Sequence, residues 1–173
     1  MVTGQTDVAL LILRVVFGLV MAGHGSQKLF GWFGGSGLTG FSEMLHRFGL
    51  RPAGLWAWVS ALTETFGGLM LALGVLTPLA AGLVITNLLM AILTVHWRNG
   101  FWITNRGFEY PLTLAGGVLA VGLAGPGAYA LGPNTVAGLS PLVLFAAALV
   151  LGLVGVLIAL FTGLGHLERR TVS

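Results

Sequence analysis

The sequence predicts an all-α integral membrane protein: a transmembrane four-helix bundle with an additional fifth transmembrane helix at its C-terminal end. Of the 173 residues, 56% are hydrophobic and only 8% are charged, whereas an ordinary soluble domain has about 25% charged residues. The apolar residues gather in five runs, each near the ~20 residues that a helix needs to cross a bilayer. Basic residues flank these runs on one side only. We therefore expect residues 1–173 to form a single integral membrane domain.

The five predicted spans cover approximately residues 8–28, 54–76, 79–97, 109–125 and 141–162. The first is expected to be a retained helix and not a signal peptide, because Arg14 interrupts it and no small-residue cleavage site follows. A tight turn at Thr77-Pro78 separates the second span from the third. Pro111 stands in the first turn of the fourth span, where its missing N–H costs nothing. Pro141 opens the fifth, which carries no charge and is predicted to be peripheral and largely lipid-facing.

A short amphipathic helix is predicted at about residues 40–49, between the first two spans. Apolar side chains recur there at helical spacing, and polar side chains take the other face. The apolar positions are Phe41, Met44, Leu45 and Phe48. A helix of this kind lies in the membrane interface.

The distribution of lysine and arginine predicts how the chain is oriented. With five spans, these basic residues fall on one side of the membrane: Lys28, Arg47, Arg51, Arg98, Arg106, Arg169 and Arg170. The positive-inside rule then places the N-terminus outside and the C-terminus in the cytoplasm.

The composition also excludes several functions. The chain has no cysteine, which excludes disulfides, thiolate metal sites and CxxC redox chemistry, so a redox role would need a bound cofactor or a partner. No HxxxH or HExxH spacing predicts a metal site, and no basic footprint predicts nucleic-acid binding. Most of the 28 glycines lie inside apolar runs, where they permit close helix packing, either within one chain or in a homo-oligomer.

Arg14 and Glu64 are the charged residues well inside the predicted spans. Because an unpaired charge at the membrane centre costs at least about 2.5 kcal/mol, we expect the two to form an intramembrane ion pair. The pair either fixes the helix register or serves as a proton relay or ligand anchor. Asn87, in the middle of the third span, either hydrogen-bonds to this pair or is a satisfied interhelical polar residue.

A polar cluster is predicted at the cytoplasmic end of the bundle. Its members are His24, Lys28, His96, Asn99, Glu109 and Tyr110. Imidazole, ammonium, carboxylate and phenol groups at the mouth of a bundle can bind and protonate a carbonyl ligand such as a quinone. The alternative is an ordinary membrane interface with an aromatic belt of Trp32, Trp97, Trp102 and Tyr110. Haem ligation by His24 and His96 is a further alternative without other support in the sequence.

Residues 9–124 resemble the DoxX family of small bacterial inner-membrane proteins. The resemblance is carried by LRVVFGLVMAGHGSQKLFGWFGG, by LTETFGGLMLALG and by TVHWRNGFWITNRGFEYPL. It implies a bundle of four transmembrane helices in a bacterial plasma membrane. The family's motif positions correspond to Arg14, His24, Lys28, Glu64, His96, Asn99, Gly100, Glu109 and Tyr110. The fifth span, at residues 141–162, departs from the family pattern.

The family takes its name from a membrane subunit of thiosulfate:quinone oxidoreductase, and some similar proteins are linked to oxidative-stress complexes with soluble redox enzymes. The resemblance thus implies a membrane or quinone-interacting subunit of a redox system, with soluble redox proteins as partners at the cytoplasmic face. The alternative is a non-enzymatic membrane anchor or assembly subunit that recruits soluble partners. A transporter is less favoured, because the spans show no repeated halves.

Overall fold

The structure is a computed structural model that describes the backbone of residues 3–171 and the side chains of residues 4–162. This part of the chain forms six α-helices, which confirms the predicted all-α class. They are α1 (Thr3–Phe30), α2 (Gly37–Arg47), α3 (Ala53–Leu73), α4 (Thr77–Ala91), α5 (Glu109–Ala124) and α6 (Pro141–Thr171). A π-helical turn, Ile92–His96, continues α4, and short 3₁₀ turns cover Trp32–Gly34, Trp97–Asn99 and Ile103–Asn105.

A helix lies at each predicted place, but several boundaries differ from the expectation. α1 begins earlier, at Thr3, and α6 continues to Thr171. Thr77 and Pro78, which were predicted to form a turn, are the first residues of α4. α3 ends at Leu73 because Gly74 adopts a left-handed conformation with φ 72°, which glycine reaches without steric cost. The third predicted span, 79–97, is not a continuous α-helix, since the backbone changes to the wider π-helical geometry at Ile92.

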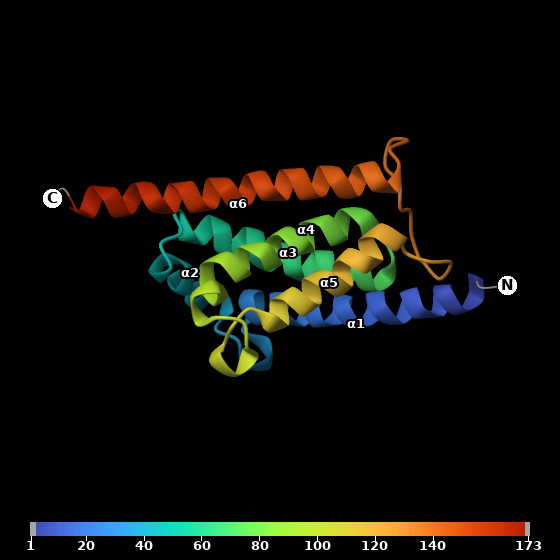
Figure 1. The fold of residues 1–173 in the computed structure, drawn as a ribbon, viewed down its shortest axis with the longest axis horizontal. Helices are drawn as coiled ribbons and strands as arrows, with labels where there is room; N and C mark the ends of the chain where they lie inside the picture. Colours follow the sequence, from blue (N-terminus) through green and yellow to red (C-terminus); the bar gives the residue numbers. More distant parts are fainter. Residues whose placement is uncertain (1–2, 172–173) are drawn as a thin grey trace.

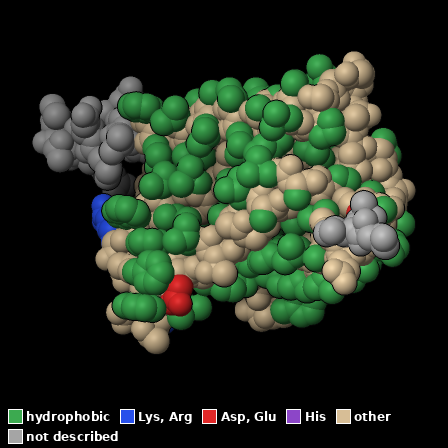
Figure 2. All heavy atoms as spheres, turned by 45° about the vertical axis from the view of Figure 1, so that its right-hand side comes forward, with side chains coloured by type: hydrophobic (Ala, Val, Ile, Leu, Met, Phe, Trp, Pro, Cys, Tyr) green, Lys and Arg blue, Asp and Glu red, His purple; other side chains and the backbone are tan. Residues whose placement is uncertain are grey.

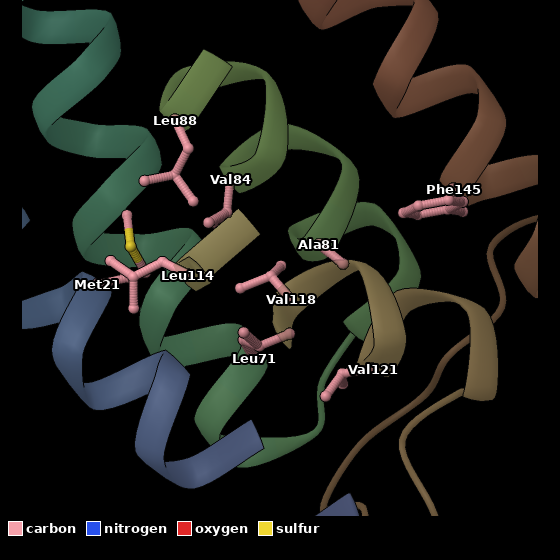
Figure 3. Close-up of a cluster of buried hydrophobic side chains, with 9 residues drawn as sticks. All are labelled: Met21, Leu71, Ala81, Val84, Leu88, Leu114, Val118, Val121 and Phe145. Carbon is pink, nitrogen blue, oxygen red and sulfur yellow. The ribbon is translucent and has the colours of Figure 1, made fainter. Parts of the chain in front are cut away.

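Four helices, α1, α3, α4 and α5, form a bundle, and α6 packs along its α4 side (Figure 1). α1 lies on the opposite side of the bundle and packs mainly along α3. All five long helices contribute to one apolar core (Figure 3). Its buried members are Met21, Leu71, Ala81, Val84, Leu88, Leu114, Val118, Val121 and Phe145.

Small residues let two pairs of helices approach closely. A Cβ added to Gly68 would lie 2.6 Å from the carbonyl oxygen of Gly18, so α1 and α3 touch through their backbones. α4 and α6 meet in the same way, because a Cβ on Gly82 would lie 2.6 Å from Cβ of Ala148. Close backbone contact of this kind is the usual means of packing helices in lipid, where apolar burial gives no driving force.

The segment between α5 and α6 folds back onto the turn between α3 and α4. Asn134 holds it there: its amide nitrogen donates to the carbonyl oxygens of Gly74 and Gly132, both at 3.0 Å, and its Oδ1 accepts from the backbone N–H of Thr77 at 2.8 Å. One side chain therefore satisfies groups at the end of α3 and at the start of α4.

Apolar residues cover most of the outer surface. Within the described residues, three helical stretches are long and apolar enough to cross a membrane: Gly4–Phe30, Thr77–Asn99 and Pro141–Thr162. α5 is apolar but has only 16 residues, and α3 has 21 residues with Glu64 and three hydroxyl side chains near its middle. Figure 2 shows a face whose visible charged atoms lie near its edges. These features are consistent with an integral membrane protein in contact with a lipid bilayer.

Candidate functional site

A cavity of about 350 Å³ lies between α2, α3, α4 with its π-helical turn, and α6. Most of its lining is apolar, and a few polar side chains reach it from α1, α3 and α4. The polar lining residues are Lys28, Ser60, Thr63, Thr86, Asn87, Thr94 and His96. An apolar cavity with a small number of polar groups is the usual form of a small-molecule site.

Lys28 is the cationic group of this cavity and belongs to a buried polar network. Its Nζ lies 2.6 Å from Oε1 of Glu64 and 3.2 Å from Oγ of Ser60, and it stands 4.7 Å from the ring centroid of Phe41. Asn87 donates to the same Glu64 oxygen at 2.7 Å. The Glu64 side chain is only 4% exposed, so Lys28 and Asn87 offset the cost of burying its charge.

The predicted ion pair between Arg14 and Glu64 is wrong. The contacts of Gly18 with Gly68 and of Gly25 with Thr65 fix the register of α1 on α3. In this register Arg14 lies roughly 17 Å along α1 from the level of Glu64, at about 1.5 Å per residue. Lys28 replaces it as the partner, since a helical side chain leans toward the N-terminus of its own helix.

Arg14 instead lies at the other end of the bundle. It is 1% exposed and donates to the backbone carbonyl oxygen of Tyr129, in the segment between α5 and α6. The Arg14 side chain also lies against the backbone of Gly74. Its contacts therefore join α1 and the end of α3 to that segment. Glu64 pairs with Lys28 and not with Arg14.

The π-helical turn brings His96 to the cavity. At about 100° per residue, an uninterrupted α-helix would place His96 on the face opposite Asn87. The wider turn at Ile92–His96 lowers the rotation per residue, so both side chains line the same cavity. Nothing in the apolar run around Ile92–His96 predicts this change of geometry.

His96 is held in one tautomer by the loop that follows it. Its Nδ1 lies 2.8 Å from the carbonyl oxygen of Arg106, which only accepts, so Nδ1 carries the proton and donates. In the neutral ring Nε2 is then an acceptor and a base. Asn99 donates to the same carbonyl oxygen at 3.2 Å, and Glu109 accepts from the backbone N–H of Ile103 at 2.8 Å. Asn99 and Glu109 thus order the loop.

His24 and Tyr110 form a separate contact between α1 and α5. The two lie 3.1 Å apart, from Nε2 to the phenol oxygen, and Nδ1 of His24 lies 3.2 Å from Oε1 of Gln27. Both ring nitrogens of His24 therefore have a hydrogen-bond partner. Ligation of haem by His24 and His96 would require His24 to lose one of these partners.

The predicted cytoplasmic cluster is thus divided. Lys28 and His96 line the cavity, whereas His24 with Tyr110, and Asn99 with Glu109, make contacts that join helices or shape the loop. Ser60 and the wall formed by α6 were not predicted from the sequence. Ser60 stands one helical turn before Glu64 on α3, and that spacing of two polar residues in an apolar run was an available signal.

The sequence model of the DoxX family matches residues 9–97. The chain belongs to the DoxX family. A protein of Bacillus subtilis (strain 168) named "Putative oxidoreductase CatD" is 30% identical over 108 residues, which cover 62% of this chain and 74% of that protein. No solved structure matches the chain.

The part matched to the DoxX family contains all of the cavity lining except the part that α6 supplies. Lys28, Glu64, Asn87 and His96 all lie within residues 9–97. The wall formed by α6 lies outside the matched residues, as do Glu109 and Tyr110. This DoxX family member therefore combines the polar network of the matched segment with a wall that its C-terminal helix supplies.

Proposed function

We propose that the chain is a membrane subunit of a redox system that binds a quinone in the cavity between α3, α4 and α6. The observation that carries the proposal is one apolar cavity that contains both the Lys28 ammonium and the His96 imidazole. Its volume of about 350 Å³ lies in the range of ligand sites, roughly 300–1,000 Å³. The name of the Bacillus subtilis relative, "Putative oxidoreductase CatD", supports the same class of function.

Reduction of a quinone to a quinol adds two electrons and two protons. The Lys28 ammonium is a donor for one quinone carbonyl oxygen, and His96, when protonated, is a donor through Nε2. The chain has no cysteine, so a soluble redox protein supplies the electrons in this proposal. The residues of the cavity hold the ring, exclude water from it and exchange its protons.

The membrane arrangement is part of the proposal. Five spans, α1, α3, α4, α5 and α6, cross a bacterial plasma membrane, with the N-terminus outside and the C-terminus in the cytoplasm, and α2 lies in the interface. The positions of four arginines support this orientation. Arg47 and Arg51 lie at the end of α2 and just after it, and Arg98 and Arg106 lie in the loop of residues 97–108. The side chains of Arg169 and Arg170 lie outside the described residues.

Quinone binding by the purified protein in lipid nanodiscs tests the proposal. His96→Ala should weaken binding of a tail-less benzoquinone about tenfold, the effect expected for loss of one hydrogen bond in a dry site. The matched control is His46→Ala, because His46 is an exposed histidine on α2 outside this cavity. Equal affinities of the wild type and His96→Ala would refute the assignment.

A non-enzymatic anchor remains the second candidate, and the exposed loop between the π-helical turn and α5 favours it. Trp97, Phe101, Trp102 and Ile103 are exposed there beside Arg98, and exposed aromatic and arginine side chains are typical of contact surfaces. A soluble protein recovered at one copy per chain, with both wild type and His96→Ala, and without quinone binding by either, would favour the anchor.

A further inference from the structure

We infer that α6 shapes the cavity for the apolar tail of its ligand through Gly155, and that this ligand enters sideways, between α3 and α6. The inference rests on the proposed function for the chemistry of the ligand's ring. The tail and the route of entry follow from how α6 is placed on the bundle.

α6 forms one wall of the cavity with small residues, and two of its glycines behave differently. Gly152 is packed against Thr86 of α4, and an added Cβ would lie 2.7 Å from the Thr86 Cβ. An added Cβ at Gly155 would meet nothing within 4 Å, although Gly155 also lines the cavity. Packing of α6 on α4 therefore requires the small residue at Gly152. At Gly155, the missing side chain leaves open space beside the cavity.

The cavity has its opening on the apolar outer surface. Val59 of α3 is 44% exposed and Leu151 of α6 is 69% exposed, yet both also line the cavity. α6 packs along α4 and makes far fewer contacts with α3. Val59 and Leu151 therefore lie on either side of a seam between α3 and α6 that the packing of these helices does not close. In a bilayer this seam faces hydrocarbon, and an apolar ligand reaches the cavity without crossing water.

The end of the cavity next to α2 is closed by apolar packing. Phe41 and Leu45 of α2 pack with Ala57 of α3 and Ala159 of α6 in one buried cluster. A ligand that enters at the seam therefore has its ring near Lys28, whose ammonium lies over Phe41. Its tail then lies along α6, beside Gly155.

Filling the space at Gly155 tests the inference. In nanodiscs, binding is measured for a tail-less benzoquinone and for the same ring with a decyl chain. Gly155→Leu should weaken binding of the decyl compound about tenfold, because the new side chain displaces roughly two methylene groups from the cavity. The affinity for the tail-less compound should stay unchanged. Gly155→Ala should give a smaller loss, and it keeps the comparison available if the leucine variant does not fold.

Gly116→Leu is the matched control. Gly116 is an exposed glycine on α5, and an added Cβ there also meets nothing within 4 Å, but it lies outside the cavity. Both compounds should bind this variant as they bind the wild type. The inference is overturned if Gly155→Leu binds the decyl compound like the wild type, or if it weakens both compounds equally.

The two hypotheses fail in different ways. If the wild type binds neither quinone, the proposed function is refuted. The role of α6 is then tested with dansyl-labelled undecanoate, which carries an apolar chain without a quinone ring. A fluorescence signal that is lost in Gly155→Leu and kept in Gly116→Leu supports the tail site, and equal signals from the two variants overturn it.

Discussion

Lys28 and Glu64 show how one charge pair organises the middle of the bundle. The carboxylate is buried, and it accepts from Lys28 and Asn87 through the same oxygen, Oε1. Its other oxygen, Oε2, has no hydrogen-bond partner among the described side chains and backbone. The buried Glu64 carboxylate therefore depends strongly on Lys28, because few other groups compensate its negative charge.

Removal of the lysine should destabilise the protein more than removal of both charges. We expect Lys28→Met to lower the free energy of unfolding by roughly 3 kcal/mol, the low end for a broken buried pair, because Lys28 keeps some exposure. The double variant Lys28→Met/Glu64→Gln should regain most of this loss, since no charge is left without a partner. Thermal unfolding of the wild type, both single variants and the double variant measures the coupling. Additive losses would show that the two side chains act independently.

Among the connecting segments, the one between α5 and α6 has a defined structure because Asn134 ties it to two helix ends. Leu131 and Leu76 extend this attachment through backbone hydrogen bonds: Leu131 N–H donates to the carbonyl oxygen of Leu73, and Leu76 N–H to that of Pro133. α6 is thus positioned at its start by contacts with the turn between α3 and α4, in addition to its packing on α4.

Asn134→Ala should lower the free energy of unfolding by about 2 kcal/mol, since it removes three hydrogen bonds and leaves helix-end groups without partners. Thr135→Ala is the control, because Thr135 is the exposed neighbour of Asn134 in the same segment. Thermal unfolding in the same detergent compares the two variants. Equal melting temperatures would mean that the segment does not hold the helix ends.

For the molecule as a whole, the proposed five-span arrangement predicts which loops face which compartment. The chain has no cysteine, so single introduced cysteines report accessibility without background. In spheroplasts treated with a membrane-impermeant maleimide, Thr135→Cys should be labelled at once, whereas Thr104→Cys should be labelled only after the membrane is opened. Both positions are exposed. Labelling of both from the same side would require a different number of spans.

Much of this architecture could be predicted from the sequence, since apolar runs, prolines and glycines mark the helices locally. The wrong pairing of Arg14 with Glu64 came from the expectation that two charges inside the spans pair with each other. The true register depends on a contact between Gly18 and Gly68, which are far apart in the chain. The wall at Gly155 likewise depends on how α6 packs on the bundle, and the apolar run around Ile92–His96 has no local pattern that predicts its π-helical turn.

The position of α6 also bears on how the protein is made. Chains are synthesised from the N-terminus, so α6 leaves the ribosome after the helices on which it packs. Until it docks on α4, the apolar lining contributed by α3 and α4 faces the surrounding lipid. The cavity therefore closes only when α6 docks, around whatever membrane-soluble molecule then lies against that face. Under the proposed function, quinone binding would then be an exchange of one membrane-soluble molecule for another.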